Sequence, residues 1–210
     1  MAKRKIVLFG GTFDPVHLGH TAVAGAAAEH IGAEKIILIP AKRSPLKDFL
    51  PVASEQDRFA MLALAVADDK KFWLSDYELK SSGPCYTLET VRHFQAKYGS
   101  DTELYWLIGA DTVDELQRWY KITGLIDECN LCVMFRAGCK RPNFAEFEAL
   151  WGRQRIEKLQ QNIIETPLID ISGTEIRSRL AAGGDAADML HPKVADYIRR
   201  HRLYKSKAES

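Results

Sequence analysis

Short apolar runs alternate along this chain with longer segments in which apolar residues recur at helical spacing. The runs are rich in isoleucine, valine and leucine, and glycine, proline or polar residues bound them, which is typical of buried parallel strands. We predict strands at 6–9, 35–40, 72–79, 104–109 and 131–135, and an extended segment at 163–171. The run at 72–79 alternates apolar and polar residues, so we place it nearer the edge of the sheet.

The segments between these runs carry the signals of helices. Ser54 and Thr87 are predicted to cap two of them, because a hydroxyl at this position accepts a backbone N–H bond. Asp111 stands where it can cap a short helix. Further helices are predicted at 21–31, at 144–161 as a charged addition to the outer face, from Ser172 to Gly183 and Gly184, and at 192–201.

This alternation predicts an α/β fold: a doubly wound, Rossmann-like and mostly parallel sheet with helices on both faces. We expect a single domain over residues 1–204 and a disordered polar tail at 205–210. In such sheets ligands bind beyond the carboxyl ends of the strands, near the point where the strand order reverses. The loops that follow the predicted strands are therefore the place to search for chemistry.

Composition excludes some classes of function. The 210 residues are 46% hydrophobic and 27% charged, as in ordinary globular proteins, and the net charge of +1 argues against a general nucleic-acid binder. No apolar run approaches the roughly 18 residues of a membrane span, and no charged-then-apolar leader is present. We therefore expect a cytoplasmic protein without membrane or nucleic-acid partners. The sequence leaves a homo-oligomer open.

Basic residues gather directly after two predicted strands. Lys42, Arg43 and Lys47 follow one of them, and Arg136, Lys140 and Arg141 follow another. Such clusters usually belong to the solvated surface. Because these two lie beyond strand ends, we give an anion-binding role the same weight as a purely solvated one.

Four cysteines raise the question of a metal: Cys85, Cys129, Cys132 and Cys139. The only close pair, Cys129 and Cys132, is a lone C-x-x-C without a second pair at finger-like spacing. Cys132 also falls within a predicted strand, where it would be a small buried apolar residue. We expect reduced, structural cysteines and no protein metal site.

The stretch from Gly10 to His20 carries the strongest chemical signal. Gly10 and Gly11 end the first predicted strand and are expected to turn the backbone sharply, so that its N–H groups approach a ligand. His17 and His20 are three residues apart at the start of a helix, so both imidazoles project from one face. Gly19 leaves room for something flat to pack on the backbone. Because helix N-termini favour anions, the stretch predicts a nucleotide-phosphate site.

This stretch resembles the signature of the nucleotidyltransferases that carry a His-x-Gly-His motif. Residues 171–177, Ile-Ser-Gly-Thr-Glu-Ile-Arg, resemble their second signature, with Gly173 in place of a serine. Within this superfamily the chain most resembles the bacterial nicotinate-nucleotide adenylyltransferases, from about residue 6 to residue 204. The resemblance implies transfer of the adenylyl group of ATP to nicotinate mononucleotide, with release of pyrophosphate.

The resemblance implies a role for particular residues. His17 and His20 would be catalytic, with His20 donating to the α-phosphate; whether its ring works as imidazolium or neutral stays open. ATP and its phosphates would contact Gly10, Gly11, Thr12, Phe13, Gly19, Lys47, Gly109, Asp111, Arg136, Ser172, Thr174 and Arg177. The cofactor would be Mg²⁺, held mainly by the ATP phosphates and water. No general base is needed, because the attacking acceptor phosphate is already ionised.

Several of these residues also have a structural interpretation. Ser172 and Glu175 fit a capping box, which is compatible with a phosphate site. Asp111 is as good a helix cap as it is a contact to the nucleotide ribose. On the acceptor side, Cys85-Tyr86-Thr87 resembles the family's Ser-Tyr-Thr, which contacts the pyridine carboxylate. Trp119 and Tyr120 resemble the aromatic pair beside the pyridine ring, although a buried Trp119 is also an ordinary core residue.

Two departures from the family pattern concern the basic loops. Ser44-Pro45-Leu46-Lys47 stands for Pro-Pro-His-Lys, and Ala137 follows Arg136 where proline is usual. Alternative functions are an adenylyltransferase acting on nicotinamide mononucleotide or phosphopantetheine, and a non-catalytic nucleotide-binding sensor. A cytidylyltransferase fits less well. The first motif also resembles that of class I aminoacyl-tRNA synthetases, but their Lys-Met-Ser-Lys-Ser-like loop is missing.

Overall fold

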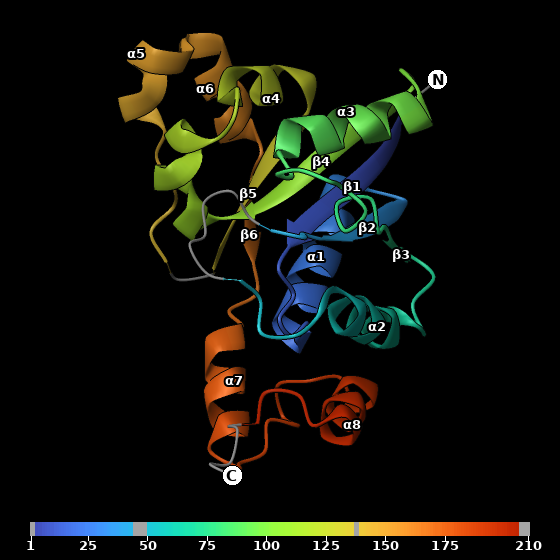
Figure 1. The fold of residues 1–210 in the computed structure, drawn as a ribbon. Helices are drawn as coiled ribbons and strands as arrows, with labels where there is room; N and C mark the ends of the chain where they lie inside the picture. Colours follow the sequence, from blue (N-terminus) through green and yellow to red (C-terminus); the bar gives the residue numbers. More distant parts are fainter. Residues whose placement is uncertain (1–2, 44–49, 137–138, 206–210) are drawn as a thin grey trace.

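The computed structural model describes residues 3–43, 50–136 and 139–205. Their core is a six-stranded sheet, entirely parallel, with the strand order β3-β2-β1-β4-β5-β6 (Figure 1). The strands are β1 (Arg4–Gly11), β2 (Lys35–Pro40), β3 (Phe72–Leu74), β4 (Thr102–Gly109), β5 (Asn130–Arg136) and β6 (Ile163–Thr166). The strand order reverses between β1 and β4, as in a doubly wound α/β sheet, so the predicted fold class is confirmed.

Helices cover both faces of the sheet, and each face has its own core. On one face, α1 (Leu18–Ile31), α2 (Glu55–Val66) and α8 (Pro192–His201) enclose side chains of β1 such as Val7 and Phe9. On the other face, α3 (Thr87–Tyr98), α4 (Ile122–Glu128) and α6 (Arg153–Gln161) enclose Ile6 and Leu8. Because β1 is buried on both sides, its sequence is a continuous apolar run rather than an alternating one.

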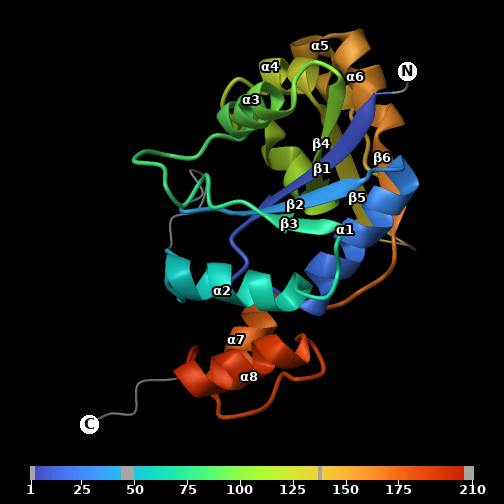
Figure 2. The ribbon, with the colours of Figure 1, turned by 90° about the vertical axis from the view of Figure 1, so that its right-hand side faces the viewer.

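The C-terminal helices extend the first of these two layers. α7 (Gly173–Ala181) and α8 lie beyond α1 and α2, on the side away from the sheet, in both views (Figures 1 and 2). Ile176 of α7 and Val194 and Ile198 of α8 join the same core as α1 and α2. None of the helices formed by the described residues is long and apolar enough to cross a membrane.

Three predicted elements differ from the structure near their ends. The strand expected over 72–79 contains only the three residues of β3, although it does lie at the sheet edge. α1 begins at Leu18 rather than at residue 21. Thr87 is the first residue of α3 and not its cap, since Tyr86 holds that position without a side-chain hydrogen bond. Ser54 does cap α2, where its hydroxyl accepts the N–H of Asp57.

The segment at 144–161 is not one charged outer helix. A 3₁₀ turn, η2 (Ala145–Phe147), leads into α5 (Glu148–Trp151). Gly152, with a φ of +82°, then interrupts the helix before α6. A residue in this left-handed conformation cannot continue an α-helix, and glycine adopts it without steric cost. The segment is also part of the second core, to which it contributes Phe144, Phe147, Trp151, Ile156 and Leu159. Of the predicted polar tail, residues 206–210 lie outside the described residues.

Candidate active site

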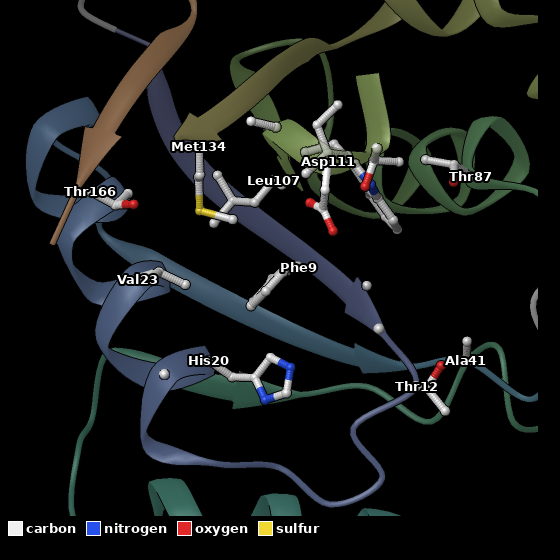
Figure 3. A pocket seen from close by; sticks show the side chains of 18 of the residues that line it. Phe9, Thr12, His20, Val23, Ala41, Thr87, Leu107, Asp111, Met134 and Thr166 are labelled. Atoms are coloured by element: carbon white, nitrogen blue, oxygen red, sulfur yellow. The ribbon is translucent and has the colours of Figure 1, made fainter. Parts of the chain in front are cut away.

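Two cavities meet at the carboxyl end of β1, and the larger one also reaches the end of β4, across the point where the strand order reverses. The larger, about 910 Å³, extends from α1 and β5 to the N-terminus of α3 (Figure 3). The smaller, about 310 Å³, lies between the β1–α1 loop and the start of α7. They share a wall made of Phe9, Gly10, Gly11, Thr12, His17, His20 and Ala41. This is the place where open α/β sheets bind ligands.

Most of the predicted site residues line one of these cavities. The larger cavity is lined by Gly10, Gly11, Thr12, His17, Gly19, His20, Tyr86, Thr87, Gly109, Asp111, Trp119 and Tyr120, and the smaller one adds Phe13, Thr174 and Arg177. Ser172 lines neither. Lys47 and the neighbouring Leu46 lie outside the described residues, as does Ala137. Arg136 ends β5 beside Thr166, but its side chain is not among those described.

Gly10 and Gly11 do not make the sharp turn predicted for them. Both are still part of β1 and pair with Ile39 and Pro40 of β2. A Cβ on Gly10 would lie 2.5 Å from the Trp106 ring, and one on Gly11 would lie 3.1 Å from the ring of Phe13. The turn is made by Phe13, whose φ is +49°. The glycines are therefore required for close packing under the cavity wall rather than for a turn.

The two histidines form one stacked unit at the N-terminus of α1. Their ring centroids are 3.6 Å apart, with 25° between the ring planes, and the ring of Phe13 meets His20 edge-on at 5.0 Å. The backbone N–H of His17 donates to Nδ1 of His20 at 3.3 Å. Since Nδ1 accepts this bond, the ring proton of His20 belongs on Nε2. His20 thus presents the N–H of Nε2 to the cavity into which its ring points (Figure 3).

His17 is the buried partner in this unit. Its side chain is only 8% exposed, and burial lowers its pKa from 6.5 to about 4. A Cβ on Gly19 would lie 3.0 Å from Nδ1 of His17, so the flat group that packs on Gly19 is the imidazole of His17 itself. Nδ1 is buried and has no hydrogen-bond partner among the described residues. His17 is consequently neutral at physiological pH and supports the ring of His20.

The second signature meets the first across the smaller cavity. Arg177 donates from Nη1 to the backbone carbonyl of Asp14 at 2.7 Å and from Nη2 to Oγ1 of Thr174 at 3.2 Å. Ser172 caps α7 by accepting the N–H of Glu175 at 3.1 Å. The reciprocal half of the predicted capping box is wrong, because the carboxylate of Glu175 pairs with Arg179 at 2.6 Å. Ser172 therefore has a structural role in this structure, and the cavity is lined by Thr174 and Arg177.

A buried polar layer beneath the β1–α1 loop was not predicted from the sequence. Arg58, 1% exposed, donates from Nη1 to the carbonyls of Thr12 at 2.7 Å and Ala41 at 2.8 Å. Burial lowers the pKa of Arg58, and the charge of Asp14 opposes that shift. Helical spacing contained a signal for Arg58, since it lies three and four residues before two core residues, Met61 and Leu62.

The far end of the larger cavity is lined mainly by aromatic residues. Tyr86 stacks on Tyr120 with ring centroids 4.4 Å apart. Trp119 is half-buried and lines the cavity, and among the described residues its buried Nε1 has no hydrogen-bond partner, so it is not an ordinary core residue. Glu78, which sequence reasoning missed, lines the same end, and its Oε1 accepts a bond from Thr90 at 2.7 Å. Burial raises the pKa of Glu78.

Asp111 lies between the two ends of this cavity and is not a helix cap. The 3₁₀ helix η1 (Ala110–Arg118) begins after Gly109, which holds the cap position without a side-chain bond. A Cβ on Gly109 would lie 2.2 Å from Oδ1 of Asp111, so the carboxylate folds back over the glycine. Its oxygens point into the cavity (Figure 3). The arrangement is suited to accepting hydrogen bonds from hydroxyl groups.

The remaining basic and sulfur groups have mainly structural surroundings. Lys42 lines the smaller cavity, where its Nζ donates to the carbonyl of Ser81 at 2.8 Å. Cys129 and Cys132 are buried, and burial raises the pKa of each thiol to about 12. Within the described part of the chain, no three His, Cys, Asp or Glu side chains gather in a way that would hold a metal ion.

Comparison with known proteins gives a consistent result. The family model described as cytidylyltransferase-like matches residues 8–179. The chain is 35% identical over 205 residues to a probable nicotinate-nucleotide adenylyltransferase of Clostridium tetani, covering 96% of this chain and 100% of that protein. It is 38% identical over 201 residues to one from Neisseria meningitidis, covering 96% and 98%.

Solved structures show the same fold. The nicotinic acid mononucleotide adenylyltransferase of Plasmodium falciparum complexed with NaAD superposes with a TM-score of 0.72 at 19% identity, over 96% of this chain and 97% of that one. A putative nicotinate-nucleotide adenylyltransferase from Vibrio parahaemolyticus gives a TM-score of 0.64 at 18% identity, over 97% of each chain.

Proposed function

Because the chain belongs to the cytidylyltransferase-like family, and within it to the nicotinate-nucleotide adenylyltransferases, we propose that its two cavities hold ATP and nicotinate mononucleotide for adenylyl transfer. The reaction gives nicotinate adenine dinucleotide and pyrophosphate, a step of NAD biosynthesis. The observation that supports this use of the cavities is the bond between Arg177 and the carbonyl of Asp14. It joins two signatures 163 residues apart around one space.

The phosphates of ATP fit the smaller cavity and the wall that it shares with the larger one. The N-termini of α1 and α7 border this space, and both favour negative charge. Arg177 adds a fixed positive charge beside it. The β- and γ-phosphates would lie against Thr174 and Arg177, and the α-phosphate would lie beside His20. The negative charge of the leaving pyrophosphate would thus lie beside Arg177 and the N-termini of the two helices.

Catalysis then rests on position and on charge stabilisation. The phosphate of the mononucleotide attacks the α-phosphorus in line and needs no protein base, because it is already ionised. The Nε2–H of His20 donates to an α-phosphate oxygen as charge develops there. His17 holds that ring in place by stacking against it. Asp111 would accept hydrogen bonds from ribose hydroxyls.

The acceptor would occupy the aromatic end of the larger cavity. Its pyridine ring would pack near Trp119, with the carboxylate directed to the backbone of Tyr86 and Thr87 at the start of α3. The N–H groups at that helix terminus suit a negative group. This arrangement favours nicotinate over nicotinamide mononucleotide, since only nicotinate carries the extra charge.

Magnesium would accompany ATP without a dedicated protein site. Phosphate oxygens and water would hold the ion. Bound in this way it would neutralise phosphate charge. A homo-oligomer, a cytoplasmic location, the absence of nucleic-acid partners and the single domain over residues 1–204 stay predictions.

A direct assay tests the proposal. The protein is supplied with ATP, Mg²⁺ and, in turn, nicotinate mononucleotide, nicotinamide mononucleotide or phosphopantetheine, and pyrophosphate release is measured. We expect the highest kcat/KM with nicotinate mononucleotide. Release with phosphopantetheine alone would refute the acceptor assignment, and binding of the dinucleotide without any release would indicate a sensor.

A further inference from the structure

A buried contact links the C-terminal end of the described chain to the β1–α1 loop. The hydroxyl of Tyr204 donates to Oδ1 of Asp14 at 2.7 Å, across 190 residues. Both side chains are buried, with 7% of each residue exposed. Burial and the Asp14 carboxylate both raise the pKa of Tyr204, so its hydroxyl remains a protonated donor. The contact is therefore a buried tyrosine–carboxylate hydrogen bond whose donor is protonated at neutral pH.

Asp14 is the point at which four segments meet. Besides the Tyr204 bond, its Oδ2 accepts the N–H of Val52 at 2.7 Å, and its Oδ1 accepts the N–H of Ala53 at 3.1 Å. Its backbone carbonyl accepts the bond from Arg177. The side chain of Asp14 is thus held by Tyr204 and by the entry to α2, while its main chain holds the guanidinium of Arg177 at the smaller cavity. A shift of Asp14 would move Arg177 with it.

From this arrangement we infer that Tyr204 and Asp14 are positioning residues for the triphosphate: the Tyr204 hydroxyl fixes Asp14, and Asp14 fixes Arg177 at the smaller cavity. Tyr204 lines neither cavity, and the Asp14 carboxylate, at the edge of the smaller one, is already engaged by Tyr204, Val52 and Ala53. Their effect passes through Arg177, so it falls on ATP and leaves the pyridine end of the larger cavity unchanged. The inference rests on the proposed adenylyl transfer for its kinetic consequence, but not for its effect on triphosphate binding.

The chain contains a matched control for the key variant. Tyr197, on α8, donates from its hydroxyl to Oδ1 of Asp57 on α2 at 2.9 Å. Tyr204→Phe and Tyr197→Phe thus each remove one oxygen and one tyrosine–carboxylate bond from the same C-terminal region. Tyr197 lines neither cavity. Any loss of stability common to such bonds appears in both variants, whereas a positioning effect appears only in Tyr204→Phe.

The experiment compares both variants with the wild type in two measurements, at a temperature well below the lowest unfolding midpoint. The first is the Kd of a non-hydrolysable ATP analogue without acceptor, and the second is KM for ATP and for nicotinate mononucleotide. For Tyr204→Phe we expect the analogue Kd and the KM for ATP to rise about 10-fold, because a small misplacement of a binding group has a large effect. The KM for the mononucleotide should change less than about 2-fold, since that end of the cavity is not touched.

Two further variants keep the inference falsifiable. Asp14→Asn keeps the size of the side chain but removes its charge, and it should weaken analogue binding in the same direction. In an Arg177→Ala background, Tyr204→Phe should cause no further loss, because the group through which it acts is gone. Tyr204→Phe kinetics equal to those of Tyr197→Phe would overturn the inference, as would additive losses in the double variant. A wild type that binds the analogue but shows no turnover would refute the proposed function and leave this inference standing.

Discussion

The burial of His17 makes the stability of this protein depend on pH in a predictable way. Its pKa is lowered from 6.5 to about 4, so between these pH values His17 is mostly neutral in the folded protein and mostly protonated in the unfolded chain. The unfolded state therefore binds more protons between these two values, and the contribution of His17 to stability is complete above pH 6.5 and is lost as the pH falls toward 4. The two pKa values give a loss of about 2 kcal/mol by pH 5 and about 3 kcal/mol by pH 4.

Urea unfolding of the wild type and of His17→Asn isolates this effect. Asparagine does not titrate and is well suited to the N-cap position that His17 occupies. The unfolding free energy of the wild type minus that of His17→Asn should fall by about 2 kcal/mol from pH 7 to pH 5. His93, whose pKa burial also lowers, is present in both proteins and cancels in the comparison. A constant difference across this range would refute the reasoning, as would an NMR titration of the His17 ring near pH 6.5.

Two other substitutions test the site directly. His20→Ala should lower kcat about 10²–10³-fold with little change in KM, because it removes a donor to the transition state. Since Nδ1 of His20 accepts the N–H of His17, the kcat of the wild type should not fall between about pH 7 and about pH 9. A fall in kcat over this range would mean that the imidazolium is the donor. Gly10→Ala should lower the free energy of unfolding by about 1–3 kcal/mol, because its Cβ would lie 2.5 Å from Trp106; an unchanged urea midpoint would show that Trp106 moves freely.

The fold could be predicted because its strands are buried on both faces. Runs such as residues 6–9 and 35–40 are continuous and apolar for that reason, and glycine or proline marks where they end. The same local logic failed at Thr87 and within 144–161. At α3 the cap position is held by Tyr86, one residue before Thr87. Within 144–161, the positive φ of Gly152 ends one helix and separates it from the next.

The site could be predicted only where its motifs are local. Residues three apart in the first turn of a helix lie on the same face, so the neighbouring rings of His17 and His20 in one cavity wall could be inferred from the sequence. The support beneath it could not, because Asp14 and Tyr204 meet across 190 residues, and no periodicity records such a pair. The close packing that requires Gly10 also depends on Trp106, a residue of another strand.

The bond between Arg177 and Asp14 has a consequence for the protein while it is being synthesised. A nascent chain that has left the ribosome only as far as α6 already contains both histidines and the first five strands of the sheet. It still lacks the guanidinium and the α7 terminus that would neutralise three phosphate groups. Products that end before α7 should therefore hold ATP poorly, and tight nucleotide binding would mark a chain that extends past Arg177.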